Sequence, residues 1–131
     1  MKKLTTIMAH RLDEMSLMNR PNDGISKATK IYVYGENDKQ GIKTPHFHVI
    51  IDNGKVEYEI EFKNIYKMSI WRTKHNAPLS WDGYTNVRDD IISWLNKIGP
   101  KNRGLTNLER MIMAWNDNNP DNEIDDDYVK G

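Results

Sequence analysis

The stretch that most constrains this chain is residues 46–62, which has the pattern of a single β-hairpin. Its Asn53-Gly54 pair is the strongest short-range signal for a tight hairpin turn, because both positions of a type I′ turn need positive φ angles. If these two residues form such a two-residue loop, Asp52 pairs with Lys55. The register of the whole hairpin then follows by counting outward from the turn.

Counting from the turn assigns the side chains to two faces, because alternate residues of a strand point to opposite sides. His48 falls opposite Glu59, and His46 falls opposite Glu61. The first face is apolar and carries Phe47, Val49, Ile51, Val56, Tyr58, Ile60 and Phe62. The second face carries His46, His48, Glu57, Glu59 and Glu61. The sequence therefore predicts a core face backed by a face rich in imidazole and carboxylate groups.

Length and composition indicate one small domain. A chain of 131 residues suffices for a modest core, and 29% of its residues are charged. Its apolar runs are too short to span a bilayer, so no membrane partner is expected. Cysteine is absent, which excludes disulfides and thiolate metal sites and fits a reducing compartment. We therefore expect a cytoplasmic protein.

Charge is distributed unevenly along the chain, although its sum is zero. Residues 1–116 hold eighteen basic and thirteen acidic side chains, whereas residues 117–131 hold six acids and one lysine. This pattern predicts a single globular domain over 1–116, followed by an acidic, disordered tail over 117–131. The alternative is an acidic arm that docks on a basic surface of this molecule or of another.

Hydrophobic periodicity predicts three helices and a sheet. Apolar residues recur at helical spacing over residues 4–15 and again over 87–98, where Gly99-Pro100 ends the run. A capping box over 106–109 starts the third helix. Strands are expected at 31–34, in the hairpin and at 66–71. This order predicts an α+β fold, with an antiparallel sheet of about four strands and the N-terminal and two C-terminal helices packed mainly on one face.

A basic and aromatic cluster follows the hairpin, in a stretch without acids from residue 62 to residue 81. It contains Lys63, Lys67, Trp71, Arg72, Lys74 and His75. If Tyr66, Met68 and Ile70 face the core, Lys67 and Trp71 share the histidine face. Such a surface suits stacking on bases and holding phosphates, or contact with another protein. The alternative is that Trp71 is buried under the following loop and the lysines are solvated.

The two histidines allow several kinds of chemistry. Because His46 and His48 point the same way, both can bind one metal ion with Glu59 as third ligand, a set that suits iron, zinc or manganese. They also suit general acid–base catalysis, since an imidazole beside a carboxylate titrates near neutrality. Glu59 and Glu61 are expected to raise the histidine pKa values. The alternative is a solvated polar face without chemistry, as on the outer side of many antiparallel sheets.

Two short segments resemble a known protein family. They are the strand segment Lys30-Ile-Tyr-Val-Tyr-Gly and, after a polar loop, Thr44-Pro-His-Phe-His-Val. Together they resemble the domain-of-unknown-function family 4160, small bacterial proteins with a Pro-Pro-His-Phe-His-Val signature. The resemblance covers about residues 25–98, with Thr44 in place of the first proline and Trp94 matching a Trp-bearing helix.

The resemblance implies a hairpin after the signature and a partner role in toxin–antitoxin-type gene pairs or mobile elements. It carries over only Pro45, His46, Phe47 and His48 as signature positions, and no catalytic role comes with them.

Three functions compete on this sequence. The leading prediction is a binding module for another protein, in a toxin–antitoxin or phage–host conflict system. Its binding face would contain His46, His48, Glu57, Glu59, Glu61, Lys67, Trp71, Arg72, Lys74 and His75. The second is a ribonuclease-like enzyme with His46 and His48 as catalytic residues and nucleic acid as substrate. The third is a divalent-metal protein using His46, His48 and Glu59; no other cofactor is predicted.

Overall fold

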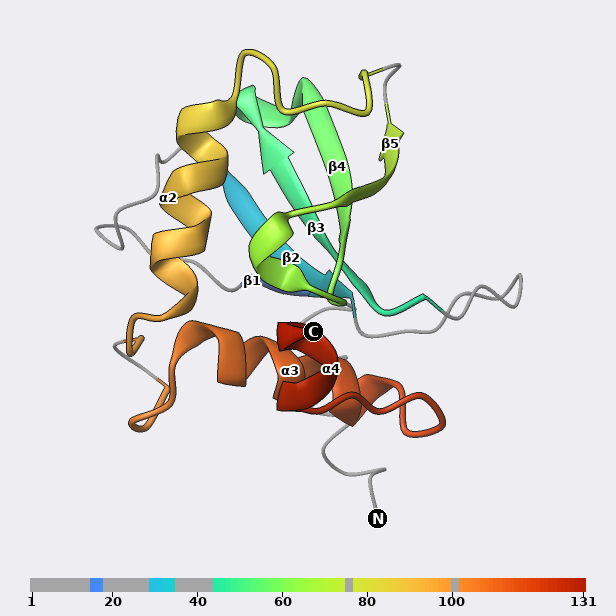
Figure 1. The fold of residues 1–131 in the computed structure, drawn as a ribbon, viewed down its shortest axis with the longest axis vertical. Helices are drawn as coiled ribbons and strands as arrows, with labels where there is room; N and C mark the ends of the chain where they lie inside the picture. Colours follow the sequence, from blue (N-terminus) through green and yellow to red (C-terminus); the bar gives the residue numbers. More distant parts are fainter. Residues whose placement is uncertain (1–14, 18–28, 35–43, 75–76, 100–101) are drawn as a thin grey trace.

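The fold is an antiparallel sheet with three helices, seen in a computed structural model that describes residues 15–17, 29–34, 44–74, 77–99 and 102–131. The sheet has the order β1 (Met15–Leu17), β2 (Lys30–Tyr34), β3 (His46–Ile51), β4 (Val56–Glu61) and β5 (Ile70–Lys74) (Figure 1). The helices are α2 (Thr85–Leu95), α3 (Asn107–Asn118) and α4 (Asp126–Lys130), with 3-10 turns η1 (Asp52–Gly54) and η2 (Ile65–Lys67). The predicted α+β class is confirmed, with five strands among the described residues.

The hairpin register predicted from the turn is confirmed. His46 pairs with Glu61 and His48 pairs with Glu59 along the β3–β4 ladder. The turn itself differs from the expected type I′ loop, because η1 is a 3-10 turn with positive φ angles at Asp52 and Gly54. The register is unchanged because the loop still joins Ile51 to Val56, which pair directly with each other.

The strand after the hairpin begins later than predicted. Residues 65–67 form η2, and β5 starts only at Ile70. Ile70 pairs with Ile60 and Arg72 pairs with Glu59, so Trp71 is the extra residue of a β-bulge. The bulge shifts the alternation of side-chain directions by one residue along the rest of the strand. It therefore places Trp71 and Arg72 on the same side of the sheet.

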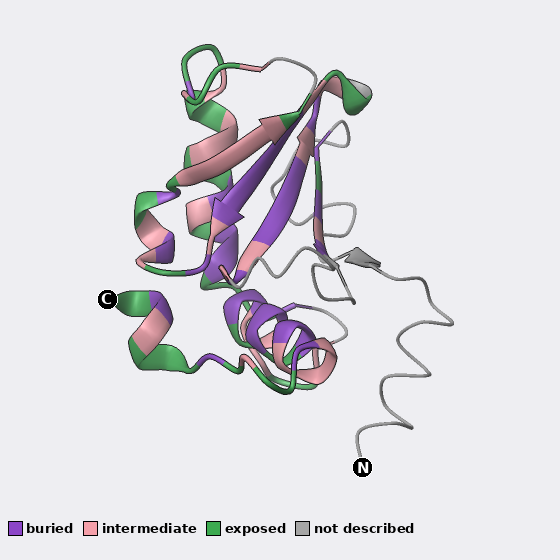
Figure 2. Ribbon diagram, turned by 90° about the vertical axis from the view of Figure 1, so that its right-hand side faces the viewer, coloured by how far each residue is buried: buried purple, intermediate pink, exposed green. Residues whose placement is uncertain are grey.

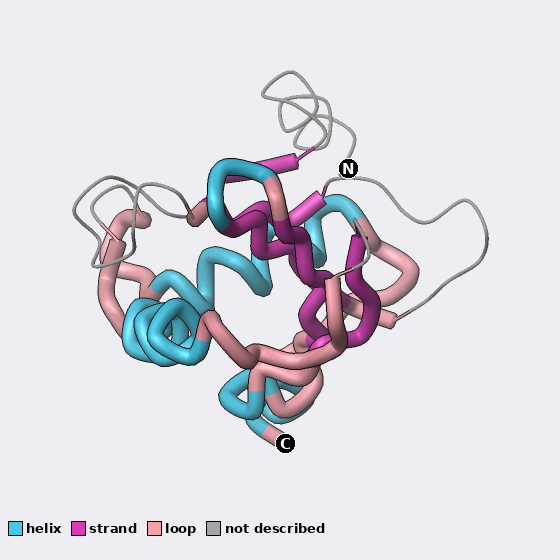
Figure 3. The backbone as a smooth tube through the Cα atoms, turned by 90° about the horizontal axis from the view of Figure 1, so that it is seen from above, coloured by secondary structure: helices cyan, strands magenta, loops and turns pink. Residues whose placement is uncertain are grey.

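The main core lies on the apolar face predicted from the hairpin. Phe47, Tyr58 and Ile60 are fully buried there, together with Ile91 and Trp94 of α2. α2 lies alongside this face (Figures 1 and 3). β3 and β4 are buried over most of their length, whereas β5 at the edge is only half-buried (Figure 2).

α2 ends earlier than its apolar pattern suggested. It stops at Leu95, and Ile98 is 64% exposed instead of joining the core. Ile98 forms an isolated bridge with Thr106, which brings the chain back to the start of α3. The predicted capping box is confirmed, with Thr106 and Glu109 each bonding the other's backbone N–H.

α3 lies across one end of the sheet (Figure 1). Its Trp115 is 5% exposed. The indole centroid lies 6.0 Å from the Phe62 ring on the core side and 5.7 Å from the His46 ring on the opposite side. Trp115 therefore closes the end of the sheet and contacts side chains of both faces.

The segment predicted as a disordered acidic tail is folded in the structure, so that prediction is wrong. Residues 117 and 118 belong to α3, and α4 follows at 126–130. Ile124 is 7% exposed and Val129 is fully buried, which anchors the segment despite its charge. The Asn116 amide side chain also bonds both the N–H and the carbonyl of Ile124. The acids remain on the outside of this anchored segment.

The predicted N-terminal helix at 4–15 lies outside the described residues, except that Met15 begins strand β1. Among the residues that the structure does describe, no helix combines the length and the apolar character needed to cross a bilayer.

Candidate functional site

The side of the sheet opposite α2 carries a connected set of charged and imidazole side chains, which we call the polar face. It consists of His46, His48, Glu57, Glu59, Arg72 and Lys74. The expectation of a solvated outer face is wrong for its centre, where His48 is 4% exposed, Glu57 8% and Glu59 2%. Buried groups of this kind need partners, because losing water without compensation is costly.

The side chains of the polar face pair diagonally. His46 lies directly opposite Glu61 in the ladder, but its Nε2 lies 3.6 Å from Oε1 of Glu59. His48 lies opposite Glu59, but its Nδ1 lies 2.8 Å from Oε2 of Glu57. Both pairs are shifted by two residues in the same sense. Diagonal neighbours in an antiparallel pair are within reach of long side chains.

The surroundings of His46 favour its neutral imidazole form. Its Nδ1–H donates to the Thr44 carbonyl at 2.8 Å, so the lone pair of the neutral ring lies on Nε2. Burial lowers the pKa of His46 below its usual value, and the nearby His48 and Arg72 act in the same direction. The Thr44 bond and Glu59 oppose this shift without overcoming it. Glu59 therefore acts in the expected direction, but burial outweighs it and the net pKa of His46 is lowered.

His48 is oriented by Glu57. Its Nδ1–H donates to Oε2 of Glu57, and Lys74 Nζ lies 3.3 Å from the same oxygen. The hydrogen bond from His48 lowers the pKa of Glu57, and the charge of Lys74 lowers it further against the opposing effect of burial. Glu57 is therefore an ionised acceptor for the Nδ1–H of His48.

Glu59 is held by Arg72 through two hydrogen bonds. Nη2 and Nε of Arg72 lie 2.7 Å and 3.1 Å from Oε1 of Glu59. The guanidinium carbon also lies 4.1 Å from the centroid of Trp71, a cation–π contact. Trp71 in turn lies 4.9 Å from the ring of His46. The bulge in β5 makes this arrangement, because it brings Trp71 and Arg72 to the same side.

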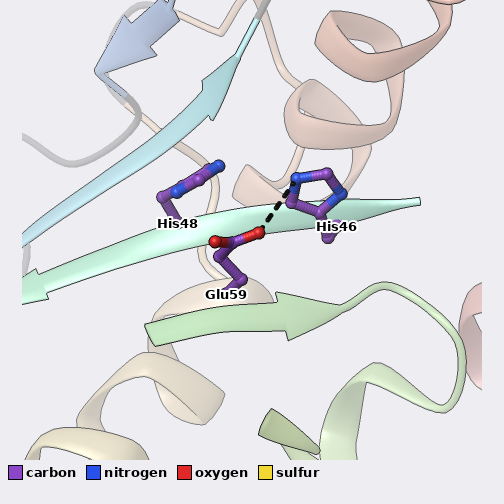
Figure 4. Close-up of side chains that lie close together, drawn as sticks. All are labelled: His46, His48 and Glu59. Carbon is purple, nitrogen blue, oxygen red and sulfur yellow. Dashed lines mark ion pairs between the residues drawn. The ribbon is translucent and has the colours of Figure 1, made fainter. Parts of the chain in front are cut away.

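His46, His48 and Glu59 converge on one point of the polar face (Figure 4). One ligand atom from each of them lies within 4.8 Å of the other two. The dashed line in the figure joins Nε2 of His46 to Oε1 of Glu59. This is the set that the sequence predicted for a metal ion, and we call it the triad.

Other predicted members of the binding face lie elsewhere. Lys67 is in η2 and exposed, because the strand that should have carried it begins only at Ile70. Glu61 is half-buried, and its charge acts on Tyr128 of α4, where it helps burial to raise the tyrosine pKa. His75 lies outside the described residues. Sequence reasoning missed Trp115, whose approach to His46 depends on the position of α3 and has no local signal.

Acidification is expected to weaken the fold in two steps. The folded pKa of His46 lies below its usual 6.5, so below that pH the unfolded chain binds a proton that the folded chain does not. Glu57 has a lowered pKa, so its stabilising effect is present above 4.5 and is lost as the pH falls through the folded value. Urea unfolding from about pH 7.5 down to about pH 3 measures both steps. His46→Gln should flatten the first step, and an unchanged slope would contradict this assignment.

No family model, curated protein or solved structure matches the chain. The resemblance to family 4160 therefore stays a prediction, and the site has to be interpreted from its own geometry.

Proposed function

We propose that this protein binds a divalent transition-metal ion through His46, His48 and Glu59. The observation that carries the proposal is that each member of the triad is already oriented by an outer partner. The Thr44 carbonyl orients His46, Glu57 orients His48, and Arg72 orients Glu59. Metal-binding imidazoles commonly donate their second N–H to a carbonyl or carboxylate, and metal-binding carboxylates are themselves hydrogen-bonded.

The distances of the triad are close to those that an ion requires. Zinc bonds of about 2.0–2.2 Å in tetrahedral geometry separate neighbouring ligand atoms by about 3.4 Å. The His46–Glu59 pair is at 3.6 Å, and the whole triad lies within 4.8 Å. Side-chain rotations that move the ligand atoms by about 1 Å would therefore bring all three to metal-binding distance.

The ligand types favour zinc, iron(II) or manganese over calcium or magnesium, because imidazole nitrogen suits the transition metals. The three described ligands leave at least one coordination position to water or to a substrate. A metal ion in such a position lowers the pKa of bound water and polarises carbonyl or phosphoryl oxygens. The proposed centre is thus of the catalytic rather than the purely structural kind.

Burial favours this function over the other two predictions. A protein-contact surface needs exposed side chains, whereas His48 and Glu59 are almost inaccessible. Burial also lowers the pKa of His46, which favours its neutral form. A neutral, buried imidazole is the form that binds metal. Protein contact, a toxin–antitoxin role and ribonuclease-like chemistry stay predictions.

The direct test is metal binding by chelator-stripped protein. Calorimetric titration with zinc should show saturable binding of one ion per chain, and mass spectrometry of metals should find the same ratio after dialysis. Iron(II) and manganese are titrated in parallel to rank the ions. The proposal is wrong if none of the three ions binds at micromolar concentrations.

A further inference from the structure

We infer that the open position of the metal centre takes a terminal phosphate group, bridged between the metal and a basic rim formed by Arg72 and Lys74. This inference rests on the proposed function and names the class of ligand for the same site. Three features of the polar face carry it: its charge balance, the depth of its charges and the preparation of Arg72.

The charge balance of the polar face favours an anion once a metal binds. Glu57 and Glu59 balance Arg72 and Lys74, and imidazoles that bind a metal are neutral. A divalent ion therefore adds a charge of about +2 to the six described residues that make up the polar face. A terminal phosphate carries about −1.5 to −2 at neutral pH, which matches this excess. A phosphodiester or a carboxylate, with a single charge, leaves half of it unbalanced.

The charges are also arranged by depth. The side chains of Glu59 and Glu57 are 2% and 11% exposed, whereas those of Arg72 and Lys74 are 41% and 47% exposed. Negative charge thus lies inside and positive charge lies at the solvent boundary. An anion that approaches from solvent meets Arg72 and Lys74 first, and this arrangement raises its local concentration.

Arg72 is prepared to bind an oxyanion. A guanidinium has five N–H donors in a planar fork, and the described contacts use two of its nitrogens on Glu59. Stacking on Trp71 fixes the plane of the fork. Lys74 lies two residues along the same edge strand, so both cations follow the rim of the polar face. The pair can hold two oxygens of one phosphate while a third binds the metal.

The test is titration of methylphosphonate, a stable analogue of a terminal phosphate, into zinc-loaded protein from which free zinc has been removed. At about pH 8 the analogue is a dianion. We expect saturable binding that is at least about tenfold weaker to the metal-free protein. Dimethyl phosphate, which imitates a nucleic-acid backbone, should bind about tenfold more weakly than methylphosphonate to the zinc-loaded protein.

The Lys74→Gln variant tests the contribution of the basic rim to phosphate binding separately from that of the metal. It should weaken methylphosphonate binding about tenfold, while the matched variant Lys67→Gln should not change it. The zinc affinity of each variant is measured first. If zinc binds but methylphosphonate does not, or binds equally to the metal-free protein or to Lys74→Gln, the inference is wrong and the metal centre stands. If zinc does not bind, the proposed function fails and the inference fails with it.

Discussion

Replacing Glu59 by Gln is expected to lower the affinity for zinc by more than about 100-fold, because loss of an outer partner alone typically costs 10- to 100-fold. The amide keeps the shape of the side chain but removes the anionic oxygen that the ion binds. Glu59 is also the ligand held by Arg72, so the change leaves the guanidinium without its carboxylate. Calorimetric titration of the metal-free variant measures the effect.

Glu61→Gln is the matched control for this variant. Glu61 lies two residues further along β4 and directly opposite His46, but it is not a member of the triad. The same chemical change there should leave zinc affinity within about threefold of the wild type, the scatter expected of a surface change. Equal losses in both variants would assign the effect to general charge, and no loss in Glu59→Gln would remove this carboxylate from the metal site.

Replacing Trp115 by Ala is expected to destabilise the protein by about 3–5 kcal/mol, the range for truncating a buried aromatic side chain. The indole packs on Phe62, and its Nε1–H donates to the Asn122 carbonyl at 2.8 Å. The variant therefore loses the packing that closes the end of the sheet and the hydrogen bond that attaches the C-terminal segment to α3. Urea unfolding measures the free-energy change, and limited proteolysis should show faster cleavage between residues 119 and 125.

Two further variants separate the contributions of Trp115. Trp115→Phe keeps an aromatic ring but removes the bond to Asn122, so it should recover most of the stability and lose about 1 kcal/mol for the hydrogen bond. Met113→Ala, at a position of α3 that is 47% exposed, should change stability by less than about 0.5 kcal/mol. If Trp115→Ala lowers the free energy of unfolding no more than Met113→Ala does, packing of the Trp115 indole is not important for the stability of the fold.

The hairpin can be predicted from sequence because its signals are local. The Asn53-Gly54 pair and the alternation of apolar and polar residues fix the register even though the turn has another conformation. Side-chain faces within β3 and β4 follow directly from that register. The triad His46, His48 and Glu59 is therefore a candidate site that the sequence alone predicts.

The burial of the polar face cannot be predicted in the same way. A strand with alternating Glu residues has the composition of a solvated surface, and pairing with Arg72 and Lys74 is what allows Glu57 and Glu59 to be buried. That pairing depends on the bulge at Trp71, a backbone irregularity without a clear sequence signal.

The prediction for the C-terminal segment is wrong for a related reason. The composition of this segment is dominated by acids, while its attachment depends on a few apolar side chains such as Ile124 and Val129.

The bulge in β5 makes the length of this strand more important than the identity of most of its residues. Trp71 is the extra residue, and every position after it is shifted by one relative to a regular strand. If Trp71 instead paired regularly with Glu59, Arg72 and Lys74 would fall opposite Tyr58 and Val56 and point toward the apolar core. Homologous chains that share the site should therefore tolerate substitutions in β5 far better than one-residue insertions or deletions.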